Sequence, residues 1–267
     1  MKKGIYIGVI ALLAVAFLVS AVYLGNYLLD SKRQADRYDQ LAQMATTQPT
    51  TTAPATTEPA ETTEPTTQAT EPTEPVILEQ YAQLHETNPD MVGWLRLEGT
   101  PINYPVMQTT TNNRDFYLTH NFDKEESKHG AIYAREECDI LKPSDNITLY
   151  GHNMKDGSMF AGLGEYYKKE TWEKNSIITF DTLYEYHVYK IFAVFKTSAN
   201  LNQGFSYHRF EDAANAEEFD EFVKTCKDLA FYDTGIIPSY GDKLLCLSTC
   251  EYTLDNGRLV VAAVRIS

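Results

Sequence analysis

The chain has 267 residues, of which 43% are hydrophobic, so it is long enough to bury one large core or two small ones. Its net charge of −14 excludes a protein that holds nucleic acid by neutralising phosphates, because that mode of binding needs an excess of Lys and Arg. Aromatic residues make up 12% of the chain, which excludes a wholly disordered protein and indicates an acidic folded surface.

The N-terminal run Gly4–Gly25 contains no charged residue and predicts a membrane anchor. As a helix it spans roughly 33 Å, about the thickness of a bilayer core. Lys2 and Lys3 precede it, and the positive-inside rule then places the C-terminal bulk outside the cell. We predict a transmembrane anchor over residues 1–30, single-pass in the cell membrane. A signal peptide cleaved near Val19–Ala21 is the alternative.

Two segments without a core of their own follow. Residues 31–45 are expected to form a polar juxtamembrane segment. Residues 46–75 contain only Thr, Pro, Glu, Ala and Gln, so they cannot bury apolar surface and are predicted to form a disordered stalk. In extended form the stalk could reach up to roughly 90 Å. The remaining residues, 76–267, are predicted to form one domain, which carries most of the negative charge.

The pattern of this domain predicts a mainly β fold with helices, either a barrel or a sandwich. Residues 77–88 have helical spacing and predict a short opening helix, and Glu211–Ala230 predicts a longer amphipathic helix with Cys226 on its apolar face. Short β-branched and aromatic runs predict strands at Ile102–Val106, Ala131–Ala134, Ile147–Tyr150, Ile177–Phe180, Tyr186–Phe195, Leu244–Ser248 and Leu259–Ile266.

Cys250 is the candidate nucleophile among the four cysteines, which have no metal-binding spacing. It follows an apolar strand and precedes a polar turn, so its thiol is expected to open to solvent at a barrel rim. Cys246 lies on the same strand, with its Cα roughly 13 Å away, beyond disulfide reach. A thiol attacks as the thiolate, which needs a nearby cation or imidazolium.

Two residues are candidates for that support. Arg258 follows the hairpin signal Asp255–Gly257, so an antiparallel return brings it beside Cys250, where it can donate to the sulfur or to an oxyanion. Arg265 lies seven residues further and therefore points to the opposite face. Among six histidines, His152 is the candidate acid or base because it lies in a loop directly after a predicted strand.

Several motifs together resemble the active-site signature of the class B sortases. They are Leu247–Cys250, Gly257–Val261, Tyr150–Met154 and Gly157–Phe160, preceded by Asn88–Leu95 and Ile102–Val106, which resemble the start of that domain. The resemblance covers residues 77–267. It implies an eight-stranded sortase-type β-barrel with an N-terminal helical extension and a long helix before the strand that ends at the cysteine. No metal or cofactor is expected.

The resemblance also implies a cysteine transpeptidase. In such an enzyme Cys250 attacks the carbonyl of a Thr in the C-terminal sorting motif of a secreted protein, and an amine of peptidoglycan or of its lipid-linked precursor resolves the thioester. His152 would transfer the protons, while Arg258 and the backbone N–H of Glu251 would hold the oxyanion. Ser248, Thr249 and Glu251 match positions that bind the substrate.

Three alternatives to cell-wall anchoring stay open at this point. One is a pilus-assembling class B sortase, which is disfavoured because pilus-building sortases of class C usually have a C-terminal anchor and no apolar segment follows Ser267. The second is a cell-wall Cys/His peptidase, although such enzymes place a third polar residue behind the histidine rather than an arginine opposite the cysteine. The third is an anchored wall-binding module without catalysis, for which Cys250 would be dispensable.

Overall fold

The structure, a computed structural model, describes residues 2–46, 75–140, 142–200 and 203–267. Its strands are β1 (Met91–Leu97), β2 (Asn103–Gln108), β3 (Ile132–Ala134), β4 (Asn146–Tyr150), β5 (Ile177–Thr182), β6 (Val188–Ser198), β7 (Leu244–Glu251) and β8 (Gly257–Arg265). Its helices are α1 (Lys2–Thr46), α2 (Glu79–Thr87), α3 (Lys169–Lys174) and α4 (Ala216–Leu229), with short 3-10 helices η1 (Phe116–Leu118), η2 (Ala161–Tyr167) and η3 (Tyr207–Arg209).

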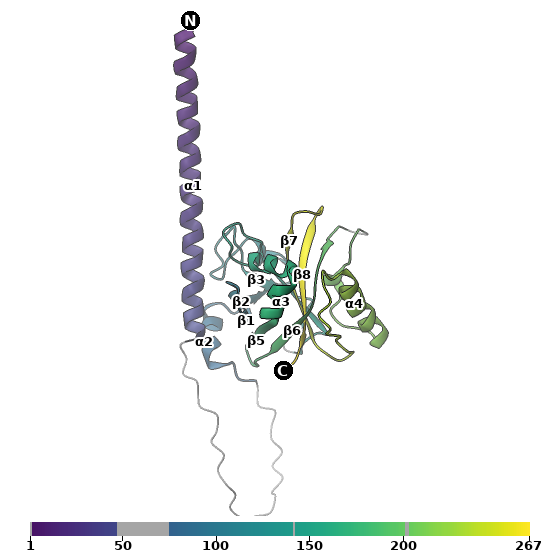
Figure 1. Cartoon of the computed structure of the whole chain (residues 1–267). Coiled ribbons are helices and arrows are strands. Elements are labelled where there is room, and N and C mark those ends of the chain that lie inside the picture. The colour runs from purple at the N-terminus through teal and green to yellow at the C-terminus, as the bar shows by residue number, and fades with distance from the viewer. Residues whose placement is uncertain (1, 47–74, 141, 201–202) are drawn as a thin grey trace, which may run out of the picture.

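The eight strands close into a barrel in the order β1-β2-β3-β4-β7-β8-β6-β5. Two neighbouring pairs, β2 with β3 and β4 with β7, run parallel, and the other pairs are antiparallel. The barrel lies between α1 and α4 (Figure 1). The predicted mainly β fold with helices is confirmed as a barrel, with the eight strands that the resemblance implies.

All seven predicted strands occur, as β2 to β8, whereas β1 was not predicted from the strand pattern. The β1 sequence MVGWLRL does not alternate between apolar and polar residues, because most of its side chains are buried on both faces of the strand. It also contains Gly93, a residue that is rare in strands. Glycine is required there, since a Cβ would collide with the backbone oxygen of Asp181 on β5.

Strands β7 and β8 present a different apolar cluster on each face, because side chains alternate along a strand. Odd-numbered residues such as Leu247 and Val261 belong to the main core, which includes the barrel interior. Even-numbered residues such as Cys246 and Val260 belong to a second cluster beneath α4. The even-numbered residues nearest the β7–β8 turn, Ser248, Cys250 and Arg258, are not part of this cluster and line a cavity, which leaves that end of the face open.

Helix α4 confirms the predicted amphipathic helix but begins five residues later, at Ala216. The Asn215 side chain accepts a hydrogen bond from the backbone N–H of Glu218 at 3.0 Å, which caps the first turn and sets the start of the helix. Cys226 is fully buried on the apolar face, as predicted. The opening helix is also confirmed, as α2, with Tyr81 and Leu84 buried.

Helix α1 continues without a break from the apolar N-terminal run to Thr46. By length and composition it is able to cross a membrane, a property that a signal sequence shares. Residues 31–45 were predicted as a separate polar segment, yet here they extend α1 along the barrel, and Tyr38, Leu41 and Ala45 are buried in the main core. The predicted stalk, apart from its two end residues, lies outside the described residues.

A buried hydrogen bond joins α2 to the barrel wall. The Tyr81 hydroxyl donates to Asp181 at 2.6 Å, and the Tyr81 ring stacks on Trp94 with 6.2 Å between ring centroids. Burial raises the pKa of both Tyr81 and Asp181, so the phenol keeps its proton and remains the donor at neutral pH.

We expect Tyr81→Phe to lower the free energy of unfolding by about 1–3 kcal/mol, because the buried Asp181 loses its phenol donor. The control is Tyr186→Phe, whose hydroxyl donates to Gln80 at the exposed surface and whose loss should change stability by less than about 0.5 kcal/mol. Denaturant titration of both variants measures the difference, and equal losses would contradict the assignment.

Candidate active site

Cys250 lies at the penultimate position of β7, and it is the one cysteine of the four that is partly exposed. All four thiols are free, as expected for the pair Cys246 and Cys250. Burial raises the pKa of the Cys138, Cys226 and Cys246 thiols, so the reactive thiolate is disfavoured at those positions. Cys250 is therefore the thiol best placed to meet a substrate, and its predicted opening to solvent is confirmed.

The β7–β8 hairpin places Arg258 directly opposite Cys250 in the antiparallel register. Directly opposed residues project from the same face of a sheet, so both side chains occupy the face left open beside α4. One guanidinium nitrogen of Arg258 donates to the backbone oxygens of Asn256 at 3.3 Å and Gly257 at 2.9 Å. No ion pair occupies Arg258 within the described part of the chain, so its remaining donors are available to an anionic group.

His152 reaches the same place through the parallel pairing of β4 with β7. Tyr150, the last residue of β4, pairs with Ser248, so His152, two residues later in the loop after β4, comes near the level of Cys250 on β7. The loop after β4 is tied to β7 by further hydrogen bonds. Thr249 Oγ1 donates to the Gly151 oxygen at 2.7 Å, and the Asn153 side chain donates to the Cys250 oxygen at 3.0 Å.

The His152 ring is oriented by a backbone acceptor. Its Nε2 lies 2.7 Å from the Leu118 carbonyl oxygen. Because a carbonyl oxygen can only accept, Nε2 carries a proton, and in the neutral ring the lone pair lies on Nδ1. A histidine held in one tautomer is what proton transfer at a defined atom requires.

The three candidate residues line one cavity of about 350 Å³. Its lining comprises Asp115, Leu118, Tyr133, Arg135, Tyr150, Gly151, His152, Ala199, Tyr207, His208, Ser248, Thr249, Cys250, Asn256 and Arg258. The cavity is thus a partly apolar groove with a thiol, an imidazole and a guanidinium on its wall. That set can form and resolve an acyl intermediate.

The sequence did not single out the other polar groups of this cavity. Arg135 donates to Asp115 at 2.8 Å and lies 4.9 Å from the ring centroid of Tyr150. Burial lowers the pKa of His208, and the nearby arginines Arg135, Arg209 and Arg258 lower it further, so this second imidazole is neutral at pH 7. None of these residues forms a local motif. Barrel closure alone brings them together, and a single sequence carries no signal of it.

Of the predicted substrate-binding residues, Ser248 and Thr249 line the cavity and Glu251 does not. Ser248 Oγ forms a 2.6 Å hydrogen bond with the hydroxyl of Tyr207, whose pKa burial raises to about 12. The Glu251 carboxylate faces the β7–β8 turn, where it accepts hydrogen bonds from the backbone N–H groups of Thr253 at 3.0 Å and Leu254 at 3.1 Å. Its side chain therefore acts as a cap for the turn.

This cap predicts a pH-dependent contribution to stability. Burial raises the Glu251 pKa, but the hydrogen bonds from Thr253 and Leu254 outweigh burial and leave the pKa below its usual range. A lowered folded-state pKa stabilises the fold above the unfolded-state pKa of about 4.3, and this contribution is lost as the pH falls through the folded-state value. We expect Glu251→Gln to lower the melting temperature at pH 7 and the difference from wild type to shrink below about pH 4. A difference that stays constant from pH 7 to pH 3 would contradict this.

Known proteins match this chain in sequence. The family model for the sortase domain matches residues 95–266, which include all three candidate residues. Sortase B of Staphylococcus aureus is 33% identical over 186 residues, covering 69% of this chain and 73% of that protein. Sortase B of Listeria monocytogenes is 31% identical over 189 residues, with the same coverage of both chains.

The fold agrees with these matches. The solved Staphylococcus aureus sortase B–substrate complex superposes with a TM-score of 0.71 at 27% identity, covering 90% of this chain and 99% of that one. A sortase domain model over most of the chain, two relatives above 30% identity and a shared eight-stranded barrel all agree. The chain therefore belongs to the sortase family, and within it to the class B enzymes, which are cysteine transpeptidases.

Proposed function

We propose that Cys250 is the nucleophile, His152 the proton-transfer group and Arg258 the oxyanion donor of this transpeptidase. One observation carries the proposal: a partly exposed thiol, an oriented imidazole and a guanidinium that has no ion pair among the described residues line one cavity at aligned strand ends. Each residue matches the group that acyl transfer needs, namely a nucleophile, an acid or base, and a donor for the developing charge.

The reaction begins with attack of the Cys250 thiolate on the carbonyl carbon of a Thr in a sorting motif. The carbonyl oxygen becomes an oxyanion, held by the Arg258 guanidinium and the backbone N–H of Glu251. As the peptide C–N bond breaks, protonated His152 gives its proton to the leaving amine, and a thioester on Cys250 remains. Ser248 and Thr249, which line the cavity, are proposed to contact the bound motif, and Glu251 contributes through its backbone N–H.

An incoming amine then completes the transfer. Neutral His152 removes a proton as the amine attacks the thioester carbonyl, and collapse of the second oxyanion releases the Cys250 thiolate and forms a new amide. We propose that the amine belongs to peptidoglycan or to its lipid-linked precursor. The acyl donor is then a secreted protein with a C-terminal sorting motif, and the outcome is cell-wall anchoring rather than pilus assembly.

The setting proposed for this reaction is the outer face of the cell membrane. Helix α1 would be retained as a single-pass anchor, with Lys2 and Lys3 on the cytoplasmic side and the barrel outside. The composition of residues 46–75 supports an exported location, since a Thr- and Pro-rich stretch of this kind is suited to a wall-spanning linker.

The test uses the full chain in detergent micelles. We incubate it with a fluorogenic library of sorting-motif peptides, with and without a diamine or oligoglycine, and identify the products by mass spectrometry. We expect a Thr–amine amide with the added nucleophile. Release of free acid alone would favour the peptidase alternative, and the absence of both products with every motif would favour the non-catalytic wall-binding module.

A further inference from the structure

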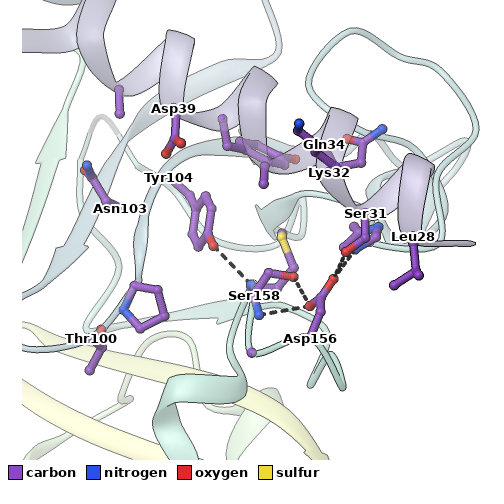
Figure 2. A pocket seen from close by; sticks show the side chains of 17 residues that line it. Leu28, Ser31, Lys32, Gln34, Asp39, Thr100, Asn103, Tyr104, Asp156 and Ser158 are labelled. Carbon is purple, nitrogen blue, oxygen red and sulfur yellow. Dashed lines mark hydrogen bonds and ion pairs between the residues drawn. The ribbon is translucent and has the colours of Figure 1, made fainter.

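The loop after β4, residues 151–160, carries both His152 and Asp156, and we refer to it as the histidine loop. Asp156 is the point at which this loop meets α1. Ser31 on α1 donates a hydrogen bond to the Asp156 carboxylate, and His129 Nε2 lies 2.8 Å from the same oxygen. Figure 2 shows Ser31 reaching from the helix to Asp156. One carboxylate thus joins the histidine loop to the helix.

Asp156 is an ionised acceptor at neutral pH. Burial raises its pKa, but hydrogen bonds from Ser158, Ser31 and His129 outweigh burial and hold the pKa well below its usual range. The His129 side chain is only 2% exposed, which excludes water from the inner side of this junction. The contact is therefore a charge-assisted one, stronger than a neutral surface hydrogen bond.

A second loop, residues 118–131, supplies the carbonyl that accepts from His152, and we refer to it as the acceptor loop. Helix α1 holds this loop as well. Arg37 forms a two-pronged ion pair with Asp123, with Nε 2.7 Å from Oδ2, and the buried Tyr38 hydroxyl donates to the Gly130 oxygen at 2.9 Å. The same helix therefore contacts both loops that orient the His152 ring, through Ser31 on one side and Arg37 and Tyr38 on the other.

The conformation of the histidine loop depends on such external contacts. Met159 adopts a left-handed backbone with φ of 54°, which is unfavourable for a residue with a side chain. Its backbone N–H donates to the Tyr104 hydroxyl at 3.1 Å, so β2 supports this end of the loop. Between His152 and Met159 the loop turns at Asp156, and the hydrogen bond from Ser31 on α1 holds this turn. A strained loop persists only where its surroundings hold it in place.

We propose that the part of α1 from Leu28 to Thr46 is a positioning element of the active site, which orients His152 through Ser31 on the histidine loop and through Arg37 and Tyr38 on the acceptor loop. The proposal rests on the proposed role of His152 in proton transfer. Because transfer depends steeply on donor–acceptor geometry, loosening these loops slows the chemical step without removing a catalytic residue. The apolar run of α1 continues directly into this part, so the anchor and the site share one helix.

The test compares full-length variants in detergent micelles. The double variant Ser31→Ala/Arg37→Ala removes one polar contact to each loop and leaves the apolar packing of Leu41 and Ala45 in place. We expect kcat to fall about 10-fold while KM for the sorting-motif peptide changes less than about 2-fold. In histidine-labelled protein, the His152 ring resonance should shift or broaden.

Two controls separate positioning from general stability. Arg33→Ala removes an exposed arginine one helical turn before Arg37 on α1 and should keep wild-type kcat. Within the described residues, Arg33 forms no ion pair. The single variant Ser31→Thr retains the hydroxyl and leaves Arg37 unchanged. It should also keep wild-type kcat and the native His152 resonance. All rates are measured well below the melting temperature of each variant.

The outcomes distinguish this proposal from the proposed function. An inactive wild type would reject the function itself. An active wild type with a double variant of unchanged kcat and unchanged His152 resonance would overturn the positioning role, even if its melting temperature fell. Equal loss of kcat in Arg33→Ala would overturn it too.

Discussion

Replacing Cys250 with alanine is expected to reduce transpeptidation by at least about 10⁴-fold, because Cys250 supplies the one thiol among the residues that line the cavity. The thioester, detected as a mass increase of the intact protein in the absence of an amine, should be lost completely. Binding of the sorting-motif peptide should persist, because the Ser248 and Thr249 positions on the cavity wall are unchanged.

The matched control is Cys138→Ala, which removes a buried thiol that does not line the cavity and should retain turnover and thioester formation. The Cys250→Ala variant should also keep its melting temperature, since the side chain is partly exposed and belongs to neither apolar cluster. Turnover retained in Cys250→Ala would refute the transpeptidase mechanism.

The second large effect is expected for Arg258→Lys, which should lower kcat by about 10²–10³-fold. Lysine keeps the positive charge, but it lacks the planar guanidinium that can bond two backbone oxygens and still present donors to an oxyanion. The measured quantity is kcat with a saturating peptide and amine. We expect a smaller change in KM, because the oxyanion forms only as the reaction proceeds.

Arg265→Lys is the control for this variant, because Arg265 lies at the far end of the same strand, beside His187. It should change kcat less than about 2-fold and stability by less than about 0.5 kcal/mol. A kcat for Arg258→Lys within 2-fold of wild type would reject the requirement for a planar guanidinium at this position, because a positive charge alone would then suffice.

Features set by local chain geometry were predictable from the sequence. The turn Asp255–Gly257 permits a short return, so the pairing of Cys250 with Arg258 was predicted and is confirmed by the strand register. The exposure of Cys250 followed from its place between an apolar strand and a polar turn. The burial of Cys226 followed from the helical spacing of its neighbours.

Helix boundaries and atypical strands were less predictable. The start of α4 depends on the Asn215 cap, and β1 escapes the alternation rule because its residues are buried on both faces. The role of the Glu251 side chain as a turn cap was also not apparent, since it depends on where the backbone N–H groups of the turn point. These features require the three-dimensional path of the chain.

By itself, the sequence determined the apolar N-terminal helix, the acidic mainly β domain and the Cys250–Arg258 hairpin, because each depends on composition or on residues close together in the chain. The tertiary structure alone decided where His152 lies, since Asn153 next to it and Cys250 are 97 residues apart and meet only through parallel pairing of β4 with β7. The tertiary structure also decided that α1 packs against the barrel and forms hydrogen bonds with the two loops around His152. Contacts between distant segments follow from closure of the whole barrel, and no local pattern encodes them.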